Sequence, residues 1–382
     1  MFHKYTVEAL SVCIARGVSV TLWGDPGAGK TSVINQISNS YNLWLETVIA
    51  SIREPSDFSG LPVVRENSMY LAPPSWAKNI VERDQQGQRS VLFYDEISTA
   101  PESVQAALLR PILEGVVGGL RLPQDVITVA AANPPEIAAG GWEMSAPIAN
   151  RFLHLDWEPD AEFVKNGFIN GFPTVEVPSF PKNITMKEKQ AKAIVGYFIG
   201  SKPDLLSRVP ENFGLSKGKF KAHSYGFPTS RAWETVARIY AACVSGKFMS
   251  DGRPIGKMTL ELMIKGVVGE AAAVAFLSYV KNLDLQNPNA ILEGVEDVII
   301  PNRADQATSL LIGLEHIFQL NPTPELWERY GDALSLLHGS NYADLAYSYS
   351  KRWLTDLRPE GCLPSNQHKQ ALSGIMNELQ SR

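Results

Sequence analysis

The amino-acid sequence predicts an α/β sandwich with a largely parallel central sheet, followed by a helical half. Three observations support this prediction. Short β-branched or aromatic runs alternate with helical stretches from residue 18 to about residue 157. A glycine-rich turn ends the first of these runs and opens a helix. Beyond about residue 187 the helical period continues, while the strand signal fades.

The predicted strands of the first half are short apolar segments, most of them bounded by turn residues. They cover residues 19–23, 43–51, 91–94, 126–131 and 152–155. The helices of this half are predicted over residues 4–16, 30–39, 74–83, 101–113 and 145–150. Residues 52–71 are rich in turn formers, which predicts a loop or hairpin insertion.

The second half has helical periodicity throughout. Its helices are predicted over residues 187–200, 229–243, 259–280, 304–318, 324–337 and 343–357. Residues 161–186 hold glycines and prolines without a clear period, so we expect a linker or crossover there.

The composition is that of an ordinary globular protein, with 45% hydrophobic and 20% charged residues. Forty Asp and Glu against 35 Lys and Arg give a net charge of −5, which argues against wholesale binding to nucleic acid or to an anionic membrane. Cys13, Cys243 and Cys362 lie far apart and show no metal-ligand spacing. We therefore expect a reducing, cytoplasmic setting and no membrane insertion.

A phosphate-binding motif follows the first predicted strand. Residues 24–31 match G-x-x-x-x-G-K-[ST] between a strand and a helix, which is the context that this motif requires. The glycines let backbone N–H groups converge on phosphate oxygens, Lys30 can reach the β and γ phosphates, and Thr31 can hold Mg²⁺. The predicted cofactor-binding residues are Gly24, Asp25, Pro26, Gly27, Ala28, Gly29, Lys30, Thr31 and Ser32.

An acidic partner for this motif ends the strand over residues 91–94. Asp95 and Glu96 follow that apolar run directly, in the manner of a Walker B motif. We assign Asp95, with Thr31, to Mg²⁺, and Glu96 to the attacking water as general base. The expected cofactors are ATP and Mg²⁺, and the expected reaction is hydrolysis of ATP.

These motifs and those around them resemble the MoxR branch of the AAA+ ATPases. The resemblance covers about residues 1–280 and is closest up to Phe152. It rests on the phosphate-binding motif, Pro55–Gly60, Asp95-Glu96-Ile97, Val104–Leu109 and Ala131–Pro134. It implies a P-loop AAA+ αβα sandwich with a parallel sheet, then an all-helical lid and a C-terminal helical extension.

The resemblance also implies roles for residues outside the phosphate-binding motif. Asn133 is similar to the sensor 1 residue that orients the nucleophile. Arg151 is similar to an arginine finger that reaches a neighbouring subunit, and Arg231 to sensor 2 at the start of a lid helix. The insertion at residues 52–71 corresponds to the helix-2 insert, which is expected to face the pore or a partner, and Gly115–Gly119 is expected to form another pore-side loop.

The sequence departs from the family pattern at two places. Ser98 and Thr99 stand where the family usually has Asn-Arg, and Arg110 lies where a helix commonly ends in acidic residues. Neither change is expected to affect the phosphate chemistry. Arg110 is either a cation at a subunit interface or a solvated side chain.

The resemblance implies that the chain has four segments and that the protein acts as a motor. We expect a nucleotide-binding domain at 1–160, a linker at 161–186, a lid at 187–290 and an extension at 291–382. The implied protein is a ring, with a hexamer expected, that acts as a chaperone and remodels or matures a client, such as a von Willebrand factor A domain protein. A nucleic-acid motor and a nucleotide-gated scaffold with negligible hydrolysis remain the alternatives.

Overall fold

The computed structural model describes residues 2–65, 68–135, 137, 144–172, 174–209, 221–283 and 285–380. The chain forms two compact units. The first comprises Met1–Pro181 and Lys202–Leu277, and the second comprises Lys182–Ser201 and Ser278–Arg382. None of the helices in these described ranges is long and apolar enough to cross a membrane.

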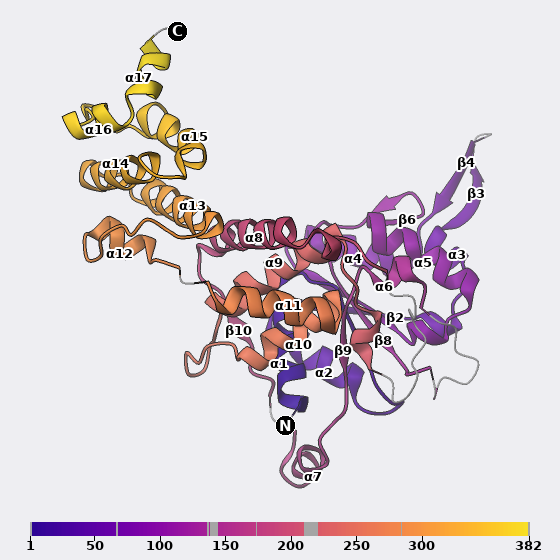
Figure 1. Ribbon diagram of the computed structural model, residues 1–382. Coiled ribbons are helices and arrows are strands. Elements are labelled where there is room, and N and C mark those ends of the chain that lie inside the picture. The colour runs from indigo at the N-terminus through magenta and orange to yellow at the C-terminus, as the bar shows by residue number, and fades with distance from the viewer. Residues whose placement is uncertain are drawn as a thin grey trace. The chain divides into compact units, whose positions relative to one another are not determined.

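The first unit is built on a five-stranded sheet whose neighbouring strands all pair in parallel (Figure 1). Across the sheet the strands are β2 (Trp44–Ile49), β5 (Ser90–Asp95), β8 (Ile127–Ala132), β1 (Val20–Trp23) and β9 (Leu153–Asp156). Each predicted strand is present within two residues of its expected ends. The predicted α/β core, with a helical region after it, is therefore confirmed.

Helices and short 3-10 turns connect the strands of this unit. The helices are α1 (Phe2–Arg16), α2 (Lys30–Ser40), α3 (Ser56–Ser59), α4 (Ser75–Gln85), α5 (Glu102–Glu114), α6 (Ala146–Ala149), α7 (Ala161–Asn170), α9 (Ser230–Ser245), α10 (Lys257–Val268) and α11 (Glu270–Lys281), the last of which runs on into the second unit. The 3-10 turns are η1 (Ala50–Ile52), η2 (Ile97–Thr99), η3 (Pro203–Leu205) and η4 (Ala222–Tyr225).

The sheet is buried because its side chains alternate between two packed faces. On one face, Leu92 and Tyr94 of β5 share a core with Trp76 and Ile80 of α4 and Leu108 of α5. Burial of this strand is nearly complete, as expected for a central parallel strand. The carboxyl ends of the strands are consequently held rigidly, which matters for the residues that follow them.

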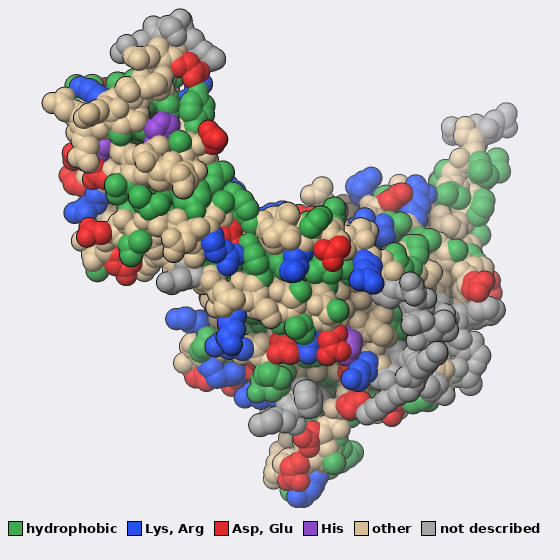
Figure 2. Space-filling model, viewed as in Figure 1, with side chains coloured by type: hydrophobic (Ala, Val, Ile, Leu, Met, Phe, Trp, Pro, Cys, Tyr) green, Lys and Arg blue, Asp and Glu red, His purple; other side chains and the backbone are tan. Residues whose placement is uncertain are grey.

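The predicted insertion forms a hairpin that projects from the unit (Figure 1). Strands β3 (Leu61–Arg65) and β4 (Ser68–Ala72) pair antiparallel, and the two residues between them lie outside the described ranges. Val64 and Met69 expose 73% and 71% of their surface, and hydrophobic side chains gather on this hairpin in Figure 2. A second hairpin joins β6 (Val116–Val117) and β7 (Leu120–Arg121) at the predicted glycine-rich turn.

The structure corrects the sequence analysis in three places. The second half is not all-helical, because β10 (Pro178–Ser179) pairs antiparallel with β11 (Lys247–Phe248). The helix expected over residues 259–280 is broken between α10 and α11 at Gly269, whose φ is +77° and whose Cβ position would lie 2.8 Å from the carbonyl oxygen of Gly226. The segment expected to be a linker contains α7, which Asp160 caps by accepting a hydrogen bond from the Glu162 N–H.

The second unit is a stack of helices. They are α8 (Ile184–Ser201), α12 (Pro288–Glu293), α13 (Ala304–Leu320), α14 (Pro324–His338), α15 (Ala343–Leu354), α16 (Asn366–Ala371) and α17 (Ser373–Gln380). The Gln190 amide of α8 donates to the Ser309 carbonyl of α13 over 2.8 Å, so α8 belongs to this unit. The predicted boundaries at 187–290 and 291–382 stay predictions, and the two compact units divide the chain at other positions.

The core of the second unit contains a pair of stacked indoles. The rings of Trp327 and Trp353 lie 4.2 Å apart at 13°, and each Nε1–H donates to the other residue's carbonyl. Gly331 leaves room for this pair, because a Cβ at that position would lie 2.3 Å from the Trp353 ring. Trp327 of α14 and Trp353 of α15 are therefore packing residues.

Candidate functional site

The candidate site lies where β1, β5 and β8 end. Parallel strands present their carboxyl ends at one edge of the sheet, which is where ligands bind in open α/β folds. The phosphate-binding motif follows β1, Asp95 and Glu96 end β5, and Asn133 follows β8. Three segments that are distant in the sequence therefore converge at this edge.

The backbone of the motif forms the cradle that its glycines predict. Gly27 and Gly29 have φ values of +74° and +85°, which residues with a side chain rarely adopt. Gly24 is fixed by a hydrogen bond from its N–H to the Ala132 carbonyl. A Cβ on Gly24 would lie 2.4 Å from the Trp157 carbonyl oxygen, so no larger residue fits there.

The Lys30 ammonium is buried within this cradle. It donates to the carbonyls of Gly24 and Asp25 over 2.6 and 3.0 Å, and to the Asn133 Oδ1 over 3.1 Å. Burial lowers the pKa of Lys30, while three nearby carboxylates, Asp95 the strongest of them, raise it. Every partner of this ammonium is an oxygen, so a phosphate oxygen can replace one of them without leaving the charge unpaired.

The side-chain oxygens of Thr31 and Asp95 lie close enough together to bind one Mg²⁺ ion. The Thr31 hydroxyl donates to the Asp95 Oδ2 over 3.2 Å, and the Asp95 Oδ1 accepts from the Glu96 N–H over 2.9 Å. Magnesium in nucleotide sites is usually held by one or two protein oxygens together with substrate phosphates and water. These two residues therefore fit an Mg²⁺ ion that arrives with a nucleotide.

Glu96 stands in a strained position at the mouth of the site. Its φ of +56° is in the left-handed region, which costs energy for a residue with a side chain and is often found at functional positions. Its carboxylate is exposed and accepts a short hydrogen bond from the Ser51 hydroxyl. The side chain therefore has one protein partner and can also reach water.

Ser98 contacts a residue of the candidate site, and the expectation that the departure at residues 98 and 99 leaves the phosphate chemistry unaffected stays a prediction. Its buried hydroxyl accepts from the Asn133 N–H over 3.0 Å and donates to the Asn133 carbonyl over 3.2 Å. Since the Asn133 side chain contacts Lys30, Ser98 fixes a residue of the site. Thr99 makes a more exposed contact, from its half-buried hydroxyl to the Glu96 carbonyl over 2.9 Å.

The two arginines lie together beyond this cradle. Burial lowers the pKa of Arg151, and the nearby charge of Arg231 lowers it further. The Asn150 side chain holds their two segments together, because its Oδ1 accepts from the Thr229 hydroxyl and its Nδ2 donates to the Phe227 carbonyl. In the part of the chain that the structure describes, no hydrogen bond or ion pair joins either guanidinium to the phosphate-binding motif.

Arg110 lies on the exposed side of α5. Its Nε is 3.3 Å from the Glu114 carboxylate, one turn along the same helix. An exposed pair at this spacing contributes a few tenths of a kcal/mol. Within the single chain, Arg110 is therefore a paired surface cation.

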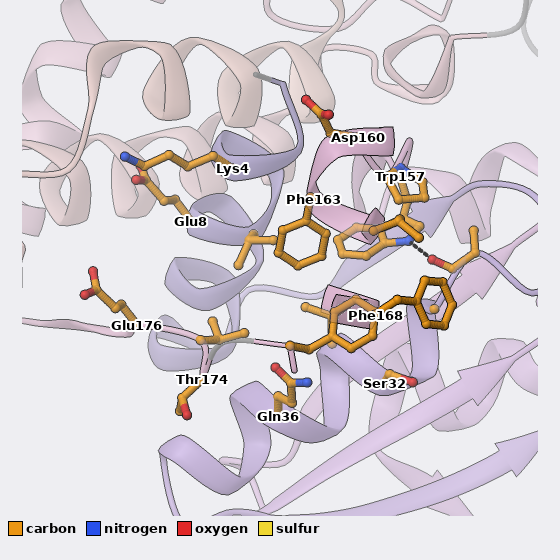
Figure 3. A pocket seen from close by; sticks show the side chains of 18 of the residues that line it. Lys4, Glu8, Ser32, Gln36, Trp157, Asp160, Phe163, Phe168, Thr174 and Glu176 are labelled. Atoms are coloured by element: carbon orange, nitrogen blue, oxygen red, sulfur yellow. Dashed lines mark hydrogen bonds between the residues drawn. The ribbon is translucent and has the colours of Figure 1, made fainter. Parts of the chain in front are cut away.

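A cavity of about 710 Å³ opens beside the cradle (Figure 3). Its walls come from α1, α2, α7 and the segment after α7, and they are mostly apolar. Trp157 lines it and donates its indole N–H to the Ala28 carbonyl over 2.8 Å. The cavity has the size and character of a small-molecule site, and it is continuous with Gly27–Gly29.

Sequence reasoning missed Ser51, Ser98, Trp157 and the cavity residues of α7. The Ser98-Thr99 departure was a usable signal for Ser98, because a hydroxyl that replaces a longer side chain beside the acidic pair needs a local partner. Trp157 gave no such signal, since its partner Ala28 is 129 positions away. An indole that follows a buried strand otherwise predicts packing alone.

Comparison with protein-family models and with curated proteins gave no match. Among solved structures, the chain is similar to a candidate ATPase from Cytophaga hutchinsonii, with a TM-score of 0.44 and 16% identity over 75% of this chain and 91% of that one. It is also similar to a full-length MCM homologue from Methanopyrus kandleri, with a TM-score of 0.33 and 14% identity over 73% of this chain and 53% of that one. At these identities, both are similarities of fold alone.

Proposed function

We propose that the first unit binds ATP with Mg²⁺ and hydrolyses it to ADP and phosphate. The observation that supports this most strongly is the meeting of three motifs through two side-chain contacts, Lys30 with Asn133 and Thr31 with Asp95. Each contact joins the phosphate-binding motif to a different strand end. A glycine-rich turn without a ligand would not need either.

In this proposal each residue has a separate task. Lys30 and the N–H groups of the cradle bind the phosphate oxygens, as at other helix N-termini that follow a glycine-rich turn. Bound Mg²⁺ would neutralise charge on the β and γ phosphates, and Thr31 and Asp95 would hold it. Glu96 accepts a proton from the attacking water, and Asn133 orients that water through its amide.

The Glu96 side chain can take two orientations, one hydrogen-bonded to the Ser51 hydroxyl and one turned away from it. While Glu96 accepts from Ser51, one carboxylate oxygen is engaged and is less available as a base. Rotation of the Glu96 side chain away from Ser51 would release that oxygen toward the cradle. The other carboxylate oxygen of this exposed side chain can accept the proton in either arrangement, so hydrolysis in this proposal does not depend on the Ser51 contact.

Phosphate release in the presence of ATP and Mg²⁺ tests the proposal. We expect Lys30→Ala to lose nucleotide binding, and Glu96→Gln to bind ATP while its turnover falls by about 10²- to 10⁴-fold. Lys78→Ala, which changes an exposed lysine of α4, is the matched control and should behave as wild type. Wild-type turnover that both Lys30→Ala and Glu96→Gln retain would refute the assignment. Slow wild-type turnover that Glu96→Gln leaves unchanged would favour a nucleotide-gated scaffold.

We further propose that the protein works as a ring that remodels a client protein. Arg151 supports this, because its guanidinium has no described contact with its own cradle and donates instead to the Pro147 carbonyl. A cation placed there could complete the site of a neighbouring subunit, where such a group contributes about 10³-fold or more to turnover. The exposed apolar hairpin of β3 and β4 offers a surface for a client.

Specific activity against protein concentration tests the ring. We expect it to rise with concentration, and we expect Arg151→Ala to assemble without hydrolysing ATP, whereas Arg110→Ala remains active. Mixing Arg151→Ala with Lys30→Ala should restore some turnover, since each variant supplies what the other lacks. Activity that is independent of concentration and of Arg151 would refute the ring, and salt-dependent stimulation by DNA or RNA would favour the nucleic-acid motor instead.

A further inference from the structure

The cavity beside the cradle contains a polar side chain that has no task within the fold. Gln36 lies on α2, six residues after Lys30, which corresponds to about 9 Å along the helix. Its amide is half-buried and makes no hydrogen bond to any residue that the structure describes. In Figure 3 it points from α2 toward the cavity, on the side where the aromatic rings gather.

The other polar groups of the cavity differ from Gln36 in being engaged or exposed. Glu8 is bound by Arg253 over 3.0 Å and by the Thr259 hydroxyl over 2.7 Å. Asp160 caps α7. Ser32, Lys4, Thr174 and Glu176 are exposed. Gln36 is therefore the half-buried group that can both donate and accept a hydrogen bond inside this cavity.

The wall around Gln36 is fixed in place. One turn further along α2, the Ser40 hydroxyl donates to the Gln36 carbonyl over 3.0 Å and lies 3.4 Å from the Val175 carbonyl. The Tyr41 hydroxyl donates to the Pro178 carbonyl over 2.9 Å. The last two of these contacts tie the segment after α7 to the end of α2. The Gln36 amide thus faces a wall of defined position.

Aromatic rings provide the second element of a base-binding site. Phe163 and Phe172 line the cavity with their ring centroids 5.8 Å apart, and Trp157 closes the end next to the cradle. Flat aromatic faces stack on a nucleobase of any kind and do not distinguish one base from another. Discrimination must therefore come from a polar group that reads the edge of the base.

We infer that Gln36 is the specificity-determining residue of this site and that it reads the edge of adenine. This inference rests on the proposed function, because the cradle must hold the phosphates. A glutamine amide donates and accepts side by side, which matches the N7 acceptor and the N6–H₂ donor of adenine. Guanine presents two acceptors on that edge, N7 and O6, so the glutamine carbonyl would face an acceptor there.

The expected preference for ATP over GTP can be given as a ratio of affinities. A bidentate pair of this kind discriminates by about 5- to 150-fold between the correct base and a wrong one. Wild type should therefore bind ATP more tightly than GTP by a factor in this range. Gln36→Leu, which keeps the apolar stem and removes the amide, should bring the ratio close to one.

Competition with a fluorescent ADP analogue measures the affinities for ATP, GTP and inorganic tripolyphosphate. Gln36→Leu should weaken ATP binding and leave tripolyphosphate binding unchanged, whereas Gln36→Arg should shift the ratio toward GTP, because a guanidinium donates to both guanine acceptors. Asn35→Leu, the same kind of change on the exposed residue before it, is the matched control.

The outcomes separate this inference from the proposed function. Equal affinities for ATP and GTP in wild type, or a ratio that Gln36→Leu leaves unchanged, would overturn the role of Gln36 while the phosphate site remains. Binding of tripolyphosphate as tight as that of ATP would overturn the base site altogether. Absence of binding for all three ligands would refute the proposed function, and the inference with it.

Discussion

Replacing Ser98 by alanine removes the hydroxyl that holds Asn133 by both its N–H and its carbonyl. A hydrogen bond between neutral groups contributes about 0.5–1.5 kcal/mol, and a buried donor left without a partner costs about 1–3 kcal/mol. Ser98 exposes 3% of its surface, so water does not replace the lost hydroxyl. We expect the free energy of unfolding to fall by about 1–3 kcal/mol.

The same change should affect turnover more than affinity. Asn133 contacts Lys30 through its side chain, and a displacement of about 1 Å in a positioning residue can cost on the order of 10²-fold in rate. We therefore expect kcat for ATP hydrolysis to fall by about 10- to 100-fold, with a smaller change in KM.

Urea unfolding followed by tryptophan fluorescence, together with phosphate release, measures both effects. Thr99→Ala is the matched control, because it removes a hydroxyl from the next residue, whose partner is a backbone carbonyl in a more exposed place. Ser98→Ala that behaves like Thr99→Ala in both assays would refute the reasoning. A fall in stability with unchanged kcat would show that Ser98 supports the fold and that Asn133 is not sensitive to its anchor.

Three further predictions concern other parts of the chain. Trp157→Phe keeps an aromatic ring, although a smaller one, and loses the indole N–H, so nucleotide affinity should fall by about 2- to 12-fold in a fluorescence titration. Unchanged affinity would contradict a role in shaping the cradle. Burial lowers the pKa of His154 from 6.5 to about 4, so between pH 6.5 and pH 4 the unfolded chain binds a proton that the folded chain does not. The free energy of unfolding, measured by urea titration, should therefore fall by about 2 kcal/mol from pH 7 to pH 5. In His154→Gln it should fall by less. Gly331→Ala places a methyl group against the Trp353 ring and should lower the free energy of unfolding by about 1–3 kcal/mol, which a fall in melting temperature would show. Gly374→Ala, with open space around the added methyl group, should leave the melting temperature unchanged.

The parts of the fold and site that could be predicted from the sequence depend on local patterns. Residues 24–31 determine their own backbone path, because glycines at 27 and 29 permit the left-handed conformations that the cradle needs. Asp95 was predictable because it ends an apolar strand, and strand ends of a parallel sheet share one edge. The roles assigned to Arg151 and Arg231 came from family resemblance, and they stay predictions.

What could not be predicted depends on contacts between distant segments. The break at Gly269 is invisible in a helical period that continues on both sides of it, and it exists because the Gly226 carbonyl approaches the backbone there. Helix α7 was hidden by glycines and by a turn-rich setting, although Asp160 is a good cap. Helix α8 belongs to the second unit because it packs on α13. The sequence of residues 184–201 alone does not predict that contact.

The two ends of the candidate site differ in how they are built, and this difference has a consequence for function. The phosphate end consists of the glycine-rich cradle, the start of α2 and side chains at the strand ends, whereas the cavity end is walled by side chains of α1, α7 and the later part of α2. Glu8 of α1 binds Arg253 and Thr259, and the latter belongs to α10. A nucleoside in the cavity would therefore contact the elements that connect the sheet to the later helices, while the phosphates contact the cradle, the start of α2 and the strand ends. We expect ADP to stabilise the α1–α10 contact against hydrogen exchange, and tripolyphosphate to protect only the cradle; equal protection by both ligands would mean that the cavity plays no part in nucleotide binding.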